Sequence, residues 1–172
     1  MFILNHVKPE EAHGKVAEAY AVFPPGMPVP EPMLMMSASP DLALLQSNII
    51  RYFRSQEDLD LALLATIRYL VACEHQNQVC MDFNGGLLQQ AGGMSAQELG
   101  SLRANPEKSP LEEAQQEMLF FVLKAVKTPE KVGRADVEKL HQYGWTDQNI
   151  FDAVYQGAFM VAMSTMVKAL TI

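Results

Sequence analysis

The chain has 172 residues, of which 49% are hydrophobic and 19% are charged. This length and composition allow one compact domain with a continuous core, and they exclude a disordered protein and a pair of large domains. The 20 acidic residues exceed the 13 basic ones and give a net charge of −7 at pH 7, which repels a phosphate backbone and argues against a nucleic-acid partner.

Location and domain organisation follow from a few segments. Two cysteines are too few for a disulfide scaffold, and residues 1–9 lack the basic region, apolar run and cleavage site of a signal peptide. The most apolar segment, 151–172, contains Asp152, Gln156 and Lys168, so we expect a buried core helix and no membrane partner. The sequence therefore predicts a cytoplasmic protein with a single domain over residues 1–172.

Helix signals in the first third of the chain predict two helices and a connector. The first predicted helix covers 9–22, and the second begins at Ser39-Pro40. The apolar face of that second helix is predicted to consist of Leu42, Leu45, Ile49 and Phe53. Between the helices, segment 23–32 holds five prolines and predicts an extended surface connector, with a lid or a partner arm as the alternative.

The rest of the chain predicts further helices, so the expected fold class is all-α. The run 59–72 is apolar almost all round, which indicates a helix buried in a bundle or in a subunit interface. Asn77 is predicted to cap a helix that Gly92-Gly93 ends. Three further N-caps are predicted, at Ser95, Ser109 and Thr146.

The segment 73–86 contains several residues whose side chains can take part in catalysis. If Asn77 caps the helix, Cys80 is its third residue, where the free backbone N–H groups favour a thiolate and lower the thiol pKa. Asn84 lies one turn further on, where its amide would donate to the sulfur or to a bound oxyanion. His75 is a candidate general base near Cys80, and Glu74 either orients it or is solvated. The alternatives are a buried structural cysteine and a histidine that bonds the last helix carbonyls.

No cofactor is expected. The residues Cys73, His75, Cys80 and Asp82 match neither paired CxxC nor HExxH spacing, so no metal site is expected. A serine-hydrolase elbow and a phosphate-binding glycine loop are also absent from the sequence.

Four segments in this order carry a resemblance: 11–20, 39–42, 77–84 and 143–147. Together they resemble the carboxymuconolactone decarboxylase and alkylhydroperoxidase AhpD-like family over most of the chain. The resemblance implies a helical bundle that associates through hydrophobic helices into a homo-oligomer, either a dimer, a trimer or a hexamer. It also implies a small-molecule substrate bound near a subunit interface.

Members of this family that reduce peroxides carry CxxC at the start of the central helix, a histidine four residues later and a glutamate on the preceding helix. Only the second cysteine transfers to this chain, as Cys80; the other three positions are Asn77, Asn84 and about Ala65. A disulfide between positions 77 and 80 is therefore excluded. Cys73 is a candidate resolving thiol in its place, and His75 is a candidate base in place of Asn84.

Three functions remain open from the sequence. The first is a thiol-dependent peroxidase in which Cys80 attacks a hydroperoxide, Glu74 or His75 handles the proton and Asn84 stabilises the leaving oxygen. The second is a lactone decarboxylase-like lyase that stabilises an enolate-like charge and in which Cys80 is incidental. The third is a non-catalytic binding or assembly protein with the same fold.

Overall fold

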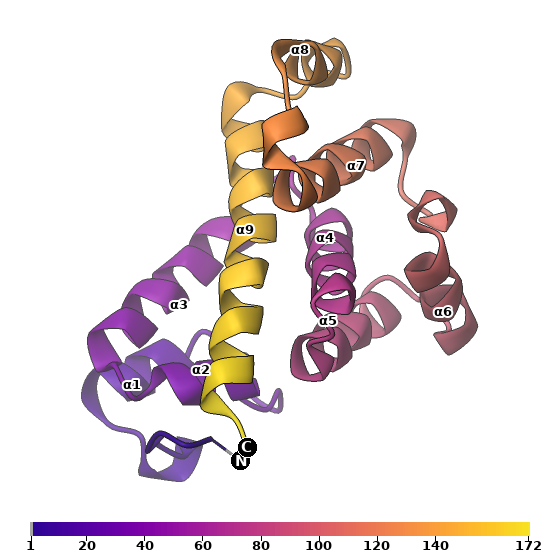
Figure 1. The fold of residues 1–172 in the computed structure, drawn as a ribbon. Coiled ribbons are helices and arrows are strands. Elements are labelled where there is room, and N and C mark those ends of the chain that lie inside the picture. Colours follow the sequence, from indigo (N-terminus) through magenta and orange to yellow (C-terminus); the bar gives the residue numbers. More distant parts are fainter. Residues whose placement is uncertain (1) are drawn as a thin grey trace. The chain divides into compact units, whose positions relative to one another are not determined.

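The structure is a computed structural model that describes residues 2–172; Met1, which belongs to the segment assessed for a signal peptide, lies outside the described residues. Within residues 2–172 the regular elements are helices, with one isolated antiparallel bridge between Phe2 and Thr171 (Figure 1). The prediction of an all-α fold is confirmed. The elements in chain order are the 3₁₀ helix η1 (Pro9–Glu11), α1 (Gly14–Tyr20), α2 (Glu31–Met36), α3 (Pro40–Arg54), α4 (Leu61–Glu74), α5 (Gln78–Gln90), α6 (Ala96–Ala104), η2 (Pro106–Lys108), α7 (Glu113–Lys127), η3 (Pro129–Lys131), α8 (Arg134–Gln142) and α9 (Asp147–Leu170).

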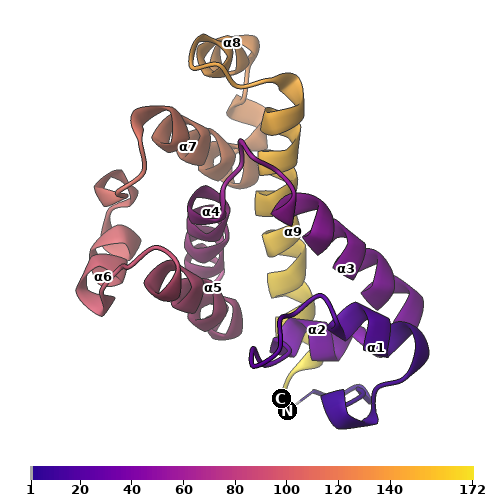
Figure 2. The same cartoon turned by 180° about the vertical axis from the view of Figure 1, so that it is seen from behind.

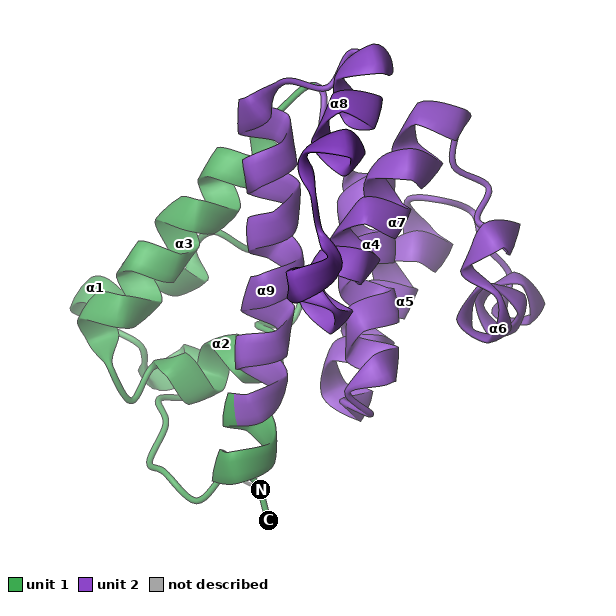
Figure 3. Cartoon of the chain, turned by 45° about the horizontal axis from the view of Figure 1, so that its top comes forward, with its two compact units in different colours: residues 1–57, 166–172 green, residues 58–165 purple. Residues whose placement is uncertain are grey.

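The chain divides into two compact units, Met1–Glu57 with Met166–Ile172, and Asp58–Thr165 (Figure 3). Each unit has its own packed helices. This division does not test whether the chain folds as the single domain predicted over 1–172, which stays a prediction.

In the first unit, α1 packs against α3. The predicted helix over 9–22 is divided into η1 and α1, because Ala12 and His13 are extended and Gly14 has a φ of +55°. The predicted connector 23–32 begins with a turn in which the Met27 N–H donates to the Pro24 carbonyl. The prediction is wrong for its last two residues, which open α2: a proline in the first helical turn loses no hydrogen bond.

Helix α3 begins at Pro40 as predicted, but its buried face differs from the prediction. Leu42 and Leu45 are 50% and 59% exposed, whereas Ala43 and Ser47 are fully buried. Small residues let two helix backbones approach closely, and α1 is the helix that packs here. The first half of the predicted stripe, Leu42 and Leu45, therefore faces outward in the single chain, whereas Phe53 is buried as predicted and Ile49 is partly buried.

In the second unit, α4 and α5 pack side by side, and α7 packs against α4 (Figure 2). Helix α4 is buried along most of its length, which confirms the prediction for the run 59–72, and the Asp60 side chain caps it by accepting from the Leu63 N–H at 2.8 Å. Gly157 of α9 marks a close approach of helices, since a Cβ built there would lie 2.6 Å from Val122 Cγ1 of α7.

Two of the three further N-caps are confirmed. Ser95 forms a capping box with Glu98 at the start of α6, and Thr146 Oγ1 accepts from the Asn149 N–H at 3.1 Å at the start of α9. The prediction for Ser109 is wrong, because α7 begins at Glu113. Ser109 follows η2, and the Gln116 side chain donates to its carbonyl at 3.1 Å, which fixes the preceding segment outside the helix.

Among the described residues, α9 is the one helix long and apolar enough to cross a membrane by length and composition. Half of its most apolar window is buried, in partial agreement with the predicted core helix, although Phe151 is 72% exposed. A single helix of this kind is weak evidence for a membrane span, and the cellular location stays a prediction.

Candidate functional site

The candidate site lies at the junction of α4 and α5. Helix α4 ends when Gln76 adopts a left-handed φ of +49°, and the Asn77 N–H then donates to the Ala72 carbonyl at 2.9 Å. These bonds satisfy carbonyls that the helix end leaves free. The turn places Asn77 directly before α5, in position to cap that helix.

Asn77 caps α5 as predicted: its Oδ1 accepts from the Cys80 N–H at 3.2 Å. Its Nδ2 donates to Ser164 Oγ of α9 at 3.1 Å. Both side chains are buried. The residue at the first position of the family's cysteine pair therefore connects α5 to α9 by hydrogen bonds.

Cys80 is the third residue of α5, as predicted, but its predicted acidity is wrong. The residue is only 3% exposed, and burial raises the thiol pKa from 9.0 to about 11, although a hydrogen bond with the Asn77 side chain opposes the shift. Desolvation of the thiolate outweighs the favourable helix N-terminus at this depth. Cys80 is a neutral thiol at pH 7.

Asn84 shares a helix face with Cys80, but its amide has partners other than the predicted sulfur. Its Nδ2 donates to the Cys80 backbone carbonyl at 2.9 Å, and its Oδ1 accepts from Arg68 Nε of α4 at 2.8 Å. Asn84 is 1% exposed. The position that carries a histidine in the resembled peroxidases thus supports a cation.

Arg68 is the site residue that the sequence analysis missed. Besides the bond to Asn84, its Nη1 donates to Gln156 Oε1 of α9 at 3.0 Å. Both partners are neutral amides, and burial lowers the pKa of the guanidinium to about 10, so it stays charged at neutral pH. One signal was available: Arg68 is the single charged residue in the apolar run 59–72 after Asp60, and a charge inside a buried helix needs polar partners.

The structure does not bring Glu74 or His75 into contact with Cys80. Glu74 pairs with Lys127 of α7 at 2.6 Å, so it does not orient the imidazole. His75 is the C-terminal cap of α4 and is partly exposed; within residues 2–172 its ring has no hydrogen-bond or ion-pair partner. Their proposed roles in proton transfer stay predictions.

The two cysteines are free thiols with different neighbours. Cys73 is half-buried near Tyr69 of α4 and Arg103 of α6. Burial raises the pKa of its thiol, and a hydrogen bond with Tyr69 and the charge of Arg103 oppose this shift. Whether Cys73 resolves an oxidised Cys80 stays a prediction. No three histidine, cysteine or acidic side chains among the described residues are grouped to bind a metal ion.

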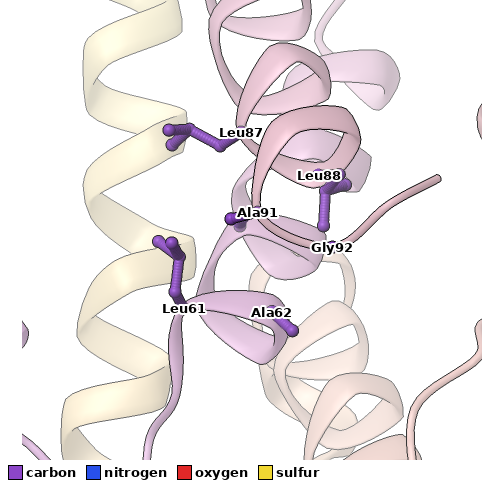
Figure 4. Close-up of a pocket in the computed structure, with 7 residues that line it drawn as sticks. Leu61, Ala62, Leu87, Leu88, Ala91 and Gly92 are labelled. Atoms are coloured by element: carbon purple, nitrogen blue, oxygen red, sulfur yellow. The ribbon is translucent and has the colours of Figure 1, made fainter.

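A small apolar pocket of about 70 Å³ lies between α4 and α5 (Figure 4). In Figure 4, Leu61 and Leu87 extend to one side of it. Ala65, which lies near the position of the glutamate in the resembled peroxidases, contributes to its wall. The residues that line the pocket are Leu61, Ala62, Ala65, Leu87, Leu88, Ala91 and Gly92. The residues that line the pocket include no carboxylate that would serve as a base.

Comparisons with known proteins identify the fold. No protein-family model matches the chain, and no curated protein matches it either. A solved structure of an uncharacterized peroxidase-related protein from Silicibacter sp. TM1040 superposes with a TM-score of 0.74 at 20% identity, over 83% of this chain and 75% of that one. An alkylhydroperoxidase AhpD core, an uncharacterized peroxidase-related protein from Ralstonia eutropha JMP134, superposes with a TM-score of 0.72 at 22% identity over the same shares. The chain has the helical fold of the alkylhydroperoxidase AhpD core.

Proposed function

We propose that this protein acts on a small molecule without a thiol redox cycle, as a lactone decarboxylase-like lyase. The observation that carries the proposal is the state of Cys80, a buried neutral thiol with a pKa of about 11. Nucleophilic attack on a peroxide requires the thiolate. The first cysteine position holds Asn77, whose side-chain atoms already bond to α5 and α9.

The polar residues near Cys80 suit a reaction that develops negative charge on oxygen. In a decarboxylation, the carbon–carbon bond to a carboxylate breaks, carbon dioxide leaves, and the electron pair remains as an enolate that takes a proton from water. A fixed cation beside the developing oxygen charge lowers the barrier to this step. Arg68 is the cation of the α4–α5 pair, and Asn84 and Gln156 orient it.

The experiment is incubation with carboxymuconolactone, with mass spectrometry of the product. We expect loss of carbon dioxide from the substrate in wild type and in Cys80→Ser, and loss of activity in Arg68→Gln. Arg103→Gln is the matched control, because Arg103 is an exposed arginine of the same unit. Activity that disappears in Cys80→Ser while the fold is kept would contradict the proposal.

A thiol-dependent peroxidase is the second candidate, because both structural neighbours are described as peroxidase-related. Intact-mass analysis after treatment with hydrogen peroxide or cumene hydroperoxide tests it. Loss of two hydrogens in wild type, with a trappable sulfenic acid in Cys73→Ser, would establish a disulfide cycle and overturn the lyase. Unchanged masses together with an inactive lactone assay would leave a non-catalytic binding protein.

A further inference from the structure

Arg68 carries a positive charge that no acidic residue of the described chain balances. The ion pairs within residues 2–172 involve lysines and a histidine, and Arg68 belongs to none of them. A partly buried charge without a counter-charge is costly, so its position favours a bound anion.

The hydrogen bonds of Arg68 leave part of the guanidinium free to bind such an anion. Nε and Nη1 donate to Asn84 and Gln156, whereas Nη2 has no partner among the described residues. Arg68 is partly buried, and the one fully buried side-chain oxygen or nitrogen without a partner in residues 2–172 is Thr171 Oγ1, so Nη2 keeps some exposed surface. The amide partners orient the guanidinium and leave one of its N–H groups without a partner.

The apolar pocket occupies the adjoining turn of the same two helices. Ala65 precedes Arg68 by three residues on α4, and Leu88 follows Asn84 by four residues on α5; both line the pocket. Its volume of about 70 Å³ is smaller than the ~150 Å³ cavity that accepts a benzene ring, which suits a short aliphatic group.

We propose that Arg68 binds the carboxylate of a small organic acid whose short apolar part enters the pocket beside Ala65 and Leu88. The inference rests on the proposed function, because it names the substrate class on which that lyase would act. The carboxylate that Arg68 holds is one that the product keeps, because a cation bound to the departing carboxylate would oppose its loss as neutral carbon dioxide. Guanidinium and carboxylate form charge-assisted hydrogen bonds, which are stronger than the bonds that a neutral amide would accept. The apolar part of the acid determines its size selectivity.

The test is NMR titration of ¹⁵N-labelled wild-type protein with acetate, butyrate and butyramide, followed at the Arg68 Nε–H resonance. We expect both carboxylates to shift this resonance, butyrate to bind more tightly than acetate, and butyramide to bind at least about tenfold more weakly than butyrate. Ala65→Leu, which fills the pocket, is expected to remove the advantage of butyrate and to leave acetate binding unchanged.

Variants at the arginine complete the design. Arg68→Lys keeps the charge but loses the planar fork and is expected to weaken butyrate binding about tenfold, whereas Arg103→Gln is expected to leave it unchanged. Two results with the wild-type protein would overturn the inference: equal binding of butyramide and butyrate, or no shift of the Arg68 resonance with either carboxylate. Neither result depends on whether a variant folds. Binding is measured here without turnover. If the protein binds butyrate but decarboxylates no substrate, the proposed function is contradicted and the inference about Arg68 still holds.

Discussion

The acidity of the Cys80 thiol is the property that separates thiol chemistry from the lyase, and its labelling rate measures it. Cys73→Ser leaves Cys80 as the single cysteine. A rise of the pKa from 9.0 to about 11 lowers the thiolate fraction at neutral pH about 100-fold, and the 3% exposure slows labelling further. We expect iodoacetamide to react with native Cys80 at least about 100-fold more slowly than with the same protein in urea.

The pH profile supplies the refutation. The labelling rate of native Cys73→Ser is expected to rise with pH up to about pH 11. An inflection at or below pH 9 would show an activated thiol and refute the reasoning.

The same shift of the Cys80 pKa links the stability of the protein to pH. Because the pKa is higher in the folded state, the contribution of the buried neutral thiol to the free energy of unfolding is complete below pH 9 and is lost between pH 9 and about pH 11. Cys80→Ala is expected to remove up to about 3 kcal/mol of this alkaline loss in urea unfolding.

Three further predictions concern packing, capping and assembly. Gly157→Ala would place a Cβ 2.6 Å from a valine of α7 and is expected to lower the free energy of unfolding in urea by about 1–3 kcal/mol. The control Gly100→Ala, which has open space around it in α6, is expected to raise this free energy by about 0.5–1 kcal/mol. Stabilisation by both substitutions would contradict the close approach at Gly157. Asn77→Ala removes the α5 cap and is expected to lower the same free energy by about 1–2 kcal/mol, and no change would mean that the cap does not stabilise the helix. We propose that the outward face of α3 contributes to a homo-oligomer, so Leu45→Lys is expected to lower the mass measured by light scattering, and a monomeric wild type would exclude this assembly.

Features that depend on neighbouring residues in the chain could be predicted from the sequence. The caps at Asn77, Ser95 and Thr146 each use a side chain that bonds a backbone N–H within three residues, so the pattern alone specifies them. The apolar run of α4 predicted burial because no face of it suits water. These local rules specified the fold class and the starts of α3, α5, α6 and α9.

Features set by distant contacts could not be predicted in this way. Ser109 has a helix-start pattern, yet the Gln116 side chain and η2 fix that segment outside the helix. The outward stripe with Leu45 depends on which helix packs on α3. In the site, the pKa of Cys80 depends on the depth of burial, and the role of Arg68 depends on a glutamine 88 residues away, neither of which spacing reveals.

The bonds of Asn77 also bear on how this sequence would acquire a cysteine pair. A single substitution, Asn77→Cys, would create CxxC, but a cysteine is a poor helix cap and would release both the Cys80 N–H and Ser164 Oγ inside the protein. The intermediate would lose stability before it gained any redox activity. Disulfide chemistry at this position would therefore require a compensating change in α9 first, so a cysteine pair is hard to reach here by stepwise mutation.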